Sequence, residues 1–161
     1  MATPAELAFE RTNLDEWQLA HLQRLLGTWG ILADLSFSDL VLLAPMAVDA
    51  REHHGRGLEL VILGQMRPSN SATVVQHDLV GQPAGAADWP LAVLTIETGE
   101  VTRGEMLLEE GEEPVRLHCI PVRCEGTTVA VLARLSAGVT HLQGFRDRSA
   151  HRVPVQRPEE G

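Results

Sequence analysis

Residues 21–39 of the chain read HLQRLLGTWGILADLSFSD, and the apolar run LVLLA at 40–44 follows at once. Apolar side chains recur in the first stretch at intervals of three, four and three residues: Leu22, Leu25, Trp29 and Leu32. This spacing is typical of one face of an amphipathic helix. We predict an N-terminal helix that begins near Leu14 after an N-cap at Asn13, and a buried strand after it.

The apolar stripe of this helix has two interpretations. Gly27 and Gly30 each weaken a helix by about 1 kcal/mol relative to alanine, so packing has to hold the segment together. The stripe either covers the core of its own domain or forms the seam of a dimer. The sequence leaves both interpretations open.

The remaining patterns predict four more strands, a helix and a tight turn. Residues 58–66 are an apolar strand, and a polar loop at 49–57 separates it from the strand at 40–44. The other expected elements are a short strand at 73–76, a helix at 86–98 ended by Gly99, and a hairpin of strands 115–123 and 128–135 that turns at Glu125 and Gly126. This order predicts an α+β fold in which helices flank a central antiparallel sheet.

The ends of the chain differ from its middle in polarity. Residues 1–12 are polar and are expected to form a flexible lead, and residues 13–140 one domain. Residues 141–161 are slightly basic, contain Pro154 and Pro158, and have little periodicity. We expect them to form a poorly ordered polar tail.

Composition excludes several classes of function. The chain has 13 basic and 22 acidic residues and a net charge of −9, and it lacks tyrosine. All basic residues are arginine, so a Schiff base, a pyridoxal phosphate lysine and a P-loop lysine are excluded. The acidic balance argues against nucleic-acid binding. Without a signal peptide or a membrane-length apolar run, we expect a cytoplasmic protein without membrane contact.

Histidine and cysteine patterns do not specify an active site. His53 and His54 are adjacent in a charged loop, while His118 and Cys119 alternate along a strand and point to opposite faces. We therefore predict no metal site. A nucleophilic site that pairs Cys119 or Cys124 with a histidine such as His77 or His141 remains an alternative, but no spacing specifies the pair. No catalytic residue is assigned.

A polar cluster follows the strand at 58–66, and it has two interpretations. Its members are Gln65, Arg67, Ser69, Asn70, Thr73, His77 and Asp78. These side chains either line the mouth of a pocket, where Arg67 holds an anion, or form a turn in which they hydrogen-bond to the nearby backbone. From the pattern alone we prefer the turn.

Four blocks resemble a known family. They are residues 21–39 quoted above, GQMRP at 64–68, TVVQHDLVG at 73–81 and IPVRCEGTTVAVLAR at 120–134. Together they are similar to the GAF domain at the N-terminus of PdtaS-type sensor histidine kinases of actinobacterial two-component systems. The resemblance runs from about residue 14 to residue 136.

This resemblance implies a GAF-like, PAS-related fold and a cytoplasmic sensor domain without catalysis of its own. In such kinases PAS and histidine-kinase segments follow, and the partner is an ANTAR-type response regulator. The residues implied to contact a ligand are Gln65, Arg67, Thr73 and His77, and the signal is a small ligand or a redox change. The resemblance implies no particular cofactor. The kinase machinery is missing from the sequence, which is expected of a fragment or a truncated paralogue. The alternative is a homodimerising interaction module without a ligand, with the seam at Leu22, Leu25, Trp29 and Leu32.

Overall fold

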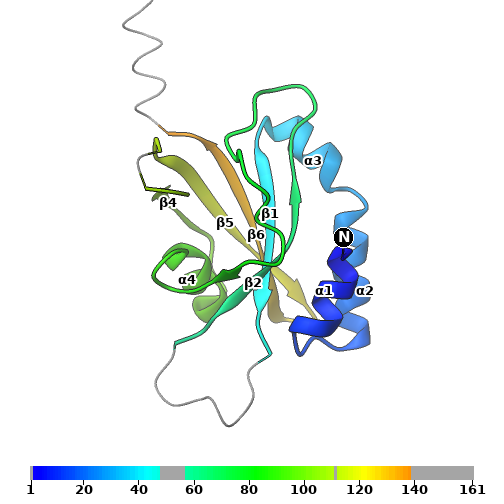
Figure 1. Cartoon of the computed structure of the whole chain (residues 1–161). Coiled ribbons are helices and arrows are strands. Elements are labelled where there is room, and N and C mark those ends of the chain that lie inside the picture. Colours follow the sequence, from blue (N-terminus) through cyan, green and yellow to red (C-terminus); the bar gives the residue numbers. More distant parts are fainter. Residues whose placement is uncertain (1, 48–56, 111, 139–161) are drawn as a thin grey trace, which may run out of the picture.

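Six strands form a single antiparallel sheet in the order β3-β2-β1-β6-β5-β4 in the computed structural model of the chain (Figure 1). The structure describes residues 2–47, 57–110 and 112–138. The strands are β1 (Asp39–Pro45), β2 (Leu60–Met66), β3 (Pro83–Ala84), β4 (Thr102–Met106), β5 (Val115–Cys124) and β6 (Thr127–Ala137). The α+β fold with a central antiparallel sheet is confirmed.

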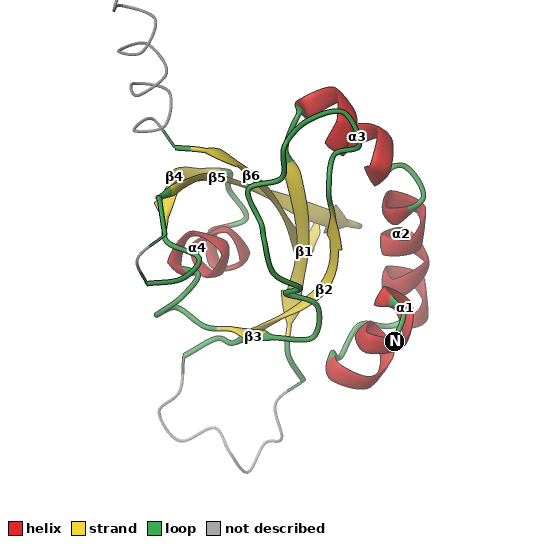
Figure 2. Cartoon of the chain, turned by 45° about the horizontal axis from the view of Figure 1, so that its top comes forward, coloured by secondary structure: helices red, strands yellow, loops and turns green. Residues whose placement is uncertain are grey.

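Helices cover both faces of this sheet. The helices α1 (Pro4–Arg11), α2 (Glu16–Leu26) and α3 (Trp29–Ser36) lie on one face, and α4 (Pro90–Thr98) lies on the other (Figure 2). Strand β1 alternates between the two layers: Leu42 packs with α1–α3, whereas Val41 and Leu43 pack with α4. Because both faces are buried, β1 is a continuous apolar run rather than an alternating one.

The predicted N-terminal helix is two helices. The N-cap is Asp15, not Asn13, because the Asp15 carboxylate accepts from the Gln18 backbone N–H at 2.8 Å and the Gln18 side chain accepts from the Asp15 backbone N–H. Helix α2 then ends at the cap residue Gly27, and α3 starts at Trp29. Gly27 itself keeps right-handed helical angles, so its low helix propensity, and not an unusual conformation, favours a break here.

The prediction of a flexible lead at residues 1–12 is wrong for residues 4–11, which form α1. The Thr3 hydroxyl accepts from the Glu6 backbone N–H at 3.2 Å, and the Glu6 carboxylate accepts from the Thr3 backbone N–H at 2.7 Å. Pro4 takes the first helical position, where its missing N–H costs nothing. Leu7 and Ala8 are buried against β2 and α2, so the lead is part of the core.

The C-terminal half confirms the hairpin and the end of the helix. Glu125 and Gly126 have φ of 51° and 82°, the two positive values of a type I′ hairpin turn. Helix α4 ends at Gly99, whose φ is 70°. The strand predicted at 73–76 is not formed, because Thr73 and Val74 bind the Asp39 carboxylate instead of a neighbouring strand.

Two predictions, on the histidines of the charged loop and on the C-terminal tail, concern residues that the structure does not describe. His53, His54, His141 and the tail at 141–161 lie outside the described residues. Within the described part of the chain, every helix is too short or too polar to cross a bilayer.

Candidate ligand-binding site

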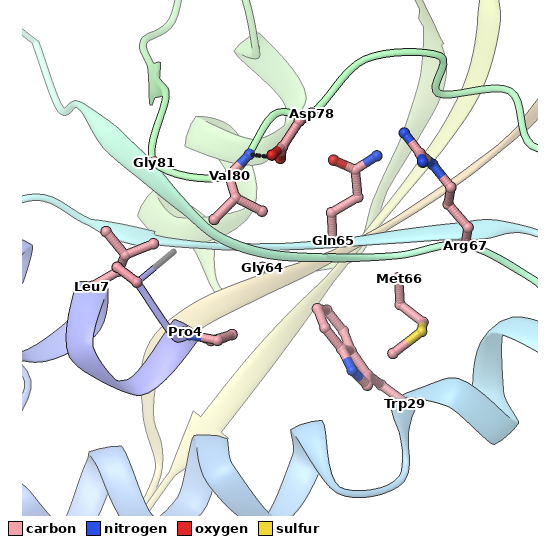
Figure 3. Close-up of a pocket in the computed structure, with 11 residues that line it drawn as sticks. Pro4, Leu7, Trp29, Gly64, Gln65, Met66, Arg67, Asp78, Val80 and Gly81 are labelled. Atoms are coloured by element: carbon pink, nitrogen blue, oxygen red, sulfur yellow. Dashed lines mark hydrogen bonds between the residues drawn. The ribbon is translucent and has the colours of Figure 1, made fainter.

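A cavity of about 650 Å³ lies along the outer edge of β2 (Figure 3). Its walls come from α1, the start of α3, β2 and the loop before β3. Strand β3 pairs with β2 only at Leu60 and Val61, so the later part of β2 is left beside the cavity. The lining residues are Ala2, Pro4, Leu7, Trp29, Gly64, Gln65, Met66, Arg67, Asp78, Val80 and Gly81.

Trp29 and Gly64 form the apolar side of the cavity. The indole of Trp29 lies against β2 at Gly64, with Met66 beside it (Figure 3). A Cβ at Gly64 would stand 2.6 Å from Cη2 of Trp29, closer than atoms approach in packed proteins. Glycine at position 64 is therefore what lets the ring sit on the strand, and it also shapes the cavity.

We expect Gly64→Ala to lower the free energy of unfolding by about 1–3 kcal/mol, because the new methyl group pushes the Trp29 ring out of place. Urea unfolding measures this change. The matched control is Gly30→Ala in α3, where the nearest atom to the new Cβ is Cε of Met66 at 3.9 Å. That variant gains helix propensity and should be as stable as the native chain or more stable. Equal destabilisation by both variants would contradict the packing of Trp29 on Gly64.

Gln65 and Arg67 lie on the other side of β2, away from Trp29 and Met66 (Figure 3). The Gln65 amide donates to the His77 carbonyl at 3.1 Å and accepts from the Leu79 N–H at 3.0 Å. Gln65 thus holds the loop against β2 where no strand is paired with it. Arg67 is exposed and donates one N–H to the same His77 carbonyl at 3.5 Å. A guanidinium has five N–H donors, so this contact leaves most of them for an anion at the rim.

The end of α3 is tied to the chain just after Arg67. The Asp34 carboxylate accepts from the Ser69 backbone N–H at 2.6 Å and from its hydroxyl at 2.8 Å. These hydrogen bonds lower the pKa of Asp34. The link is therefore complete above the ordinary pKa of an aspartate and is lost only as the pH falls through the lowered value. It fixes Arg67 relative to α3.

The structure separates the four predicted ligand residues. Gln65 and Arg67 line the cavity, but Thr73 lines a second cavity of about 420 Å³ with Asp39 and Glu112. The side chain of His77 is absent from the cavity lining and approaches Glu109 and Glu112. Trp29, Gly64 and Asp78 line the cavity as well. The sequence pattern predicts Trp29 only as a member of the helix stripe.

The helix stripe faces mainly the core of its own chain. Leu22 and Trp29 are 3 % and 6 % exposed, so in this fold neither presents a surface to a second chain. Leu25 is half-buried, and Leu32 is 39 % exposed. The stripe turns inward because α2 packs on α1 and α3 packs on β1 and β2. The exposed large apolar side chains in α1–α3 and at the α3 C-cap are Phe9, Trp17, Ile31, Leu32, Leu35 and Phe37.

Cys119 and His118 do not form a thiolate–imidazole pair. Burial raises the pKa of Cys119 to about 11, so the thiol stays protonated at neutral pH. Nε2 of His118 accepts from Nε of Arg103 at 3.3 Å. Burial, and then Arg103 and Arg134, lower the pKa of His118. Alternation along β5 sends the two side chains to opposite faces.

The fold is that of a GAF-like sensor domain. A solved structure described as the sensor region of a sensor histidine kinase superposes with a TM-score of 0.64 at 30% sequence identity. The alignment covers 88% of this chain and 44% of that chain. The sheet with helices on both faces is thus shared with a known sensory module.

The chain belongs to the family described as the GAF domain of histidine kinase PdtaS, whose family model matches residues 5–146. The sensor histidine kinase PdtaS of Mycolicibacterium smegmatis is 33% identical over 140 residues, which are 85% of this chain. PdtaS of Mycobacterium tuberculosis H37Rv is 33% identical over 137 residues, or 83% of this chain. The chain spans 26% of the length of each kinase. The actinobacterial resemblance inferred from the motifs is confirmed.

Proposed function

We propose that this chain is the sensory GAF domain of a cytoplasmic two-component histidine kinase and that it has no catalytic role of its own. The single observation that carries the proposal is the cavity beside β2. It is about 650 Å³ in volume, a size typical of small-molecule sites. The membership in a family of kinase sensor domains supports a sensory use of this cavity.

The chemistry of the lining indicates the class of ligand. Trp29, Met66 and Leu7 offer an apolar wall, and Arg67 offers a cation at the rim. The apolar wall lies on one side of the β2 edge and the guanidinium on the other (Figure 3). This arrangement suits a ligand that reaches across the edge, with an apolar part and an anionic group. Asp78 is a second charged residue of the lining, and it would disfavour a ligand with several negative charges.

The position of the cavity suggests how binding is transmitted. A ligand there would touch Pro4 and Leu7 of α1, Trp29 of α3 and the edge of β2 at once. Binding would therefore favour one packing of the helices on the sheet over others. In a kinase, PAS and histidine-kinase segments would read that packing, and an ANTAR-type response regulator would receive the phosphoryl group.

The test of this function is a thermal-unfolding screen with nucleotides and aromatic or anionic metabolites. We expect at least one compound to raise the melting temperature of the native chain and to have little effect on Arg67→Ala. Arg11→Ala is the matched control, since Arg11 ends α1 and does not line the cavity. A panel without any stabilising compound, or equal stabilisation of all three proteins, would contradict ligand sensing at this site.

A second candidate function is self-association through the outer surface of α1–α3. The observation in its favour is that, in the part of the chain that the structure describes, six of the nine exposed large apolar side chains lie within residues 9–37. Leu35 is 73% exposed and Ile31, one helical turn before it, is 64% exposed. Such an apolar patch is typical of an interface with a second copy of the chain.

Sedimentation velocity tests this second function. We expect the native chain to be a dimer and Leu35→Glu to shift it towards monomer by at least tenfold in dissociation constant. Leu94→Glu is the control, because Leu94 is 44% exposed on α4, on the opposite face of the sheet. A native monomer, or an equal effect of both variants, would exclude this surface as the dimer interface. Neither outcome affects the test of the cavity.

A further inference from the structure

His77, Glu109 and Glu112 come together outside the cavity, from two segments that are distant in the sequence. His77 belongs to the loop between β2 and β3, and the two glutamates belong to the connection between β4 and β5. Nε2 of His77 lies 3.4 Å from Oε1 of Glu109 and 3.6 Å from Oε1 of Glu112. The three ligand atoms all lie within 4.8 Å of one another.

The two distances from His77 to the glutamates match those between ligands of one small cation. A histidine nitrogen or a carboxylate oxygen lies about 2.0–2.2 Å from a zinc ion, so two such ligands in a tetrahedral site are about 3.3–3.6 Å apart. Imidazole nitrogen together with carboxylate oxygen is a donor set for divalent first-row metals, zinc and manganese among them. All three side chains are partly exposed, at 52%, 55% and 35%, so water can complete the coordination.

The surroundings of the three residues also favour a cation. Residues 97–113 hold seven glutamates and one arginine, a net charge of −6, and Glu110 and Glu113 flank the two ligand glutamates. A divalent ion would offset part of their mutual repulsion. His77 is held in place on the other side, because Gln65 and Arg67 both donate to its backbone carbonyl. The imidazole is therefore presented to the glutamates by a fixed backbone.

We propose that His77, Glu109 and Glu112 bind one divalent transition-metal ion, for which zinc is the probe. The ion would join the β4–β5 connection to the loop between β2 and β3. That loop also supplies Asp78 to the ligand cavity, and Glu112 lines the second cavity. Metal binding would thus stiffen the loop that closes one side of the ligand site. Zinc binding at this site needs no sensory ligand, so it can be tested apart from the cavity.

Isothermal titration of the full chain with zinc chloride tests the proposal, with His77→Gln and Glu112→Gln as the site variants. Histidines outside the described residues are unchanged in all proteins, so any binding there is common to them. Glu110→Gln is the matched control: it removes the same charge from the same connection without touching a ligand. We expect one zinc ion per native chain, affinity reduced by at least about tenfold in both site variants, and native affinity in the control.

Thermal unfolding in zinc gives a second measurement that is specific to this site. The ion should raise the melting temperature of the native chain and of Glu110→Gln, and leave that of His77→Gln unchanged. Without zinc, the variants should have melting temperatures close to that of the native chain, because the substituted side chains are partly exposed. Equal zinc affinity in all four proteins, or no zinc binding by the native chain, would overturn the proposal.

Discussion

Trp29→Ala is expected to lower the free energy of unfolding by about 3–5 kcal/mol, the cost of removing a buried tryptophan. Trp29 is 6% exposed and belongs to the core layer between α1–α3 and the sheet. Its ring rests on Gly64, which has no side chain of its own to fill the space that the indole would leave. Chemical denaturation followed by circular dichroism measures the loss.

Trp17→Ala is the matched control for this substitution. Trp17 lies in α2 with 59% of its surface exposed, so its removal should change stability by less than about 1 kcal/mol. If the two variants were equally stable, Trp29 would not be a core residue and the apolar wall of the cavity would be misplaced.

Asp39→Ala is expected to cost about 3 kcal/mol. The Asp39 side chain is buried, and its carboxylate accepts from the Thr73 hydroxyl and from the Val74 N–H, the latter at 2.6 Å. Removing the acceptor leaves both donors without their partner, and a lost hydrogen bond to a charged group costs about 1.5–3 kcal/mol. The loop that carries His77 and Asp78 is anchored to β1 by these contacts, so it should also become more susceptible to proteolysis.

Two further variants make this prediction specific. Thr73→Val removes one of the two donors and should cost less than Asp39→Ala. Asp88→Ala replaces an exposed aspartate near the start of α4 and should be close to neutral. Denaturation midpoints rank the three variants. A cost for Asp39→Ala no larger than that for Asp88→Ala would show that the carboxylate does not anchor the loop.

Much of the fold could be predicted because local patterns and packing agree. The apolar run at 40–44 forms β1 at the centre of the sheet, where both faces are buried. Glu125 and Gly126 make the expected tight turn, and Gly99 ends α4. Gly99 and Gly126 take the positive φ that these positions need without the steric cost that a side chain would bring.

The elements that could not be predicted have no clear apolar periodicity in the sequence. Helix α1 rests on a capping box of Thr3 and Glu6 in a polar stretch, and only its contact with the core makes it stable. Strand β4 is an edge strand within the glutamate-rich segment. Its residues alternate between exposed and half-buried, so it has no apolar run to mark it. The break at Gly27 coincides with a change of the main packing partner, from α1 for α2 to β1 and β2 for α3, and this change has no local signal.

The candidate site was predictable only on its polar side. Gln65 and Arg67 lie at the end of a buried strand and just after it. That position makes a pocket mouth one of two interpretations, although the pattern alone favours a turn. Trp29 lies 35 residues before Gly64, and nothing in the local pattern reveals that the two meet. Thr73 does not line the cavity because its hydroxyl donates to the buried carboxylate of Asp39. The His77 side chain approaches two glutamates of the β4–β5 connection instead of the cavity. Both are long-range contacts that only the folded chain shows.

The most direct test of ligand sensing at the cavity beside β2 is an NMR titration of the ¹⁵N-labelled chain with a compound that stabilises it. We expect chemical-shift changes at the indole Nε1–H of Trp29 and at the backbone amides of Gly64 and Gln65. The chemical shifts of amides around the second cavity, such as those of Val115 and Ser136, should not change. Shifts confined to the second cavity, with the Trp29 indole unchanged, would contradict the assignment of the sensory site.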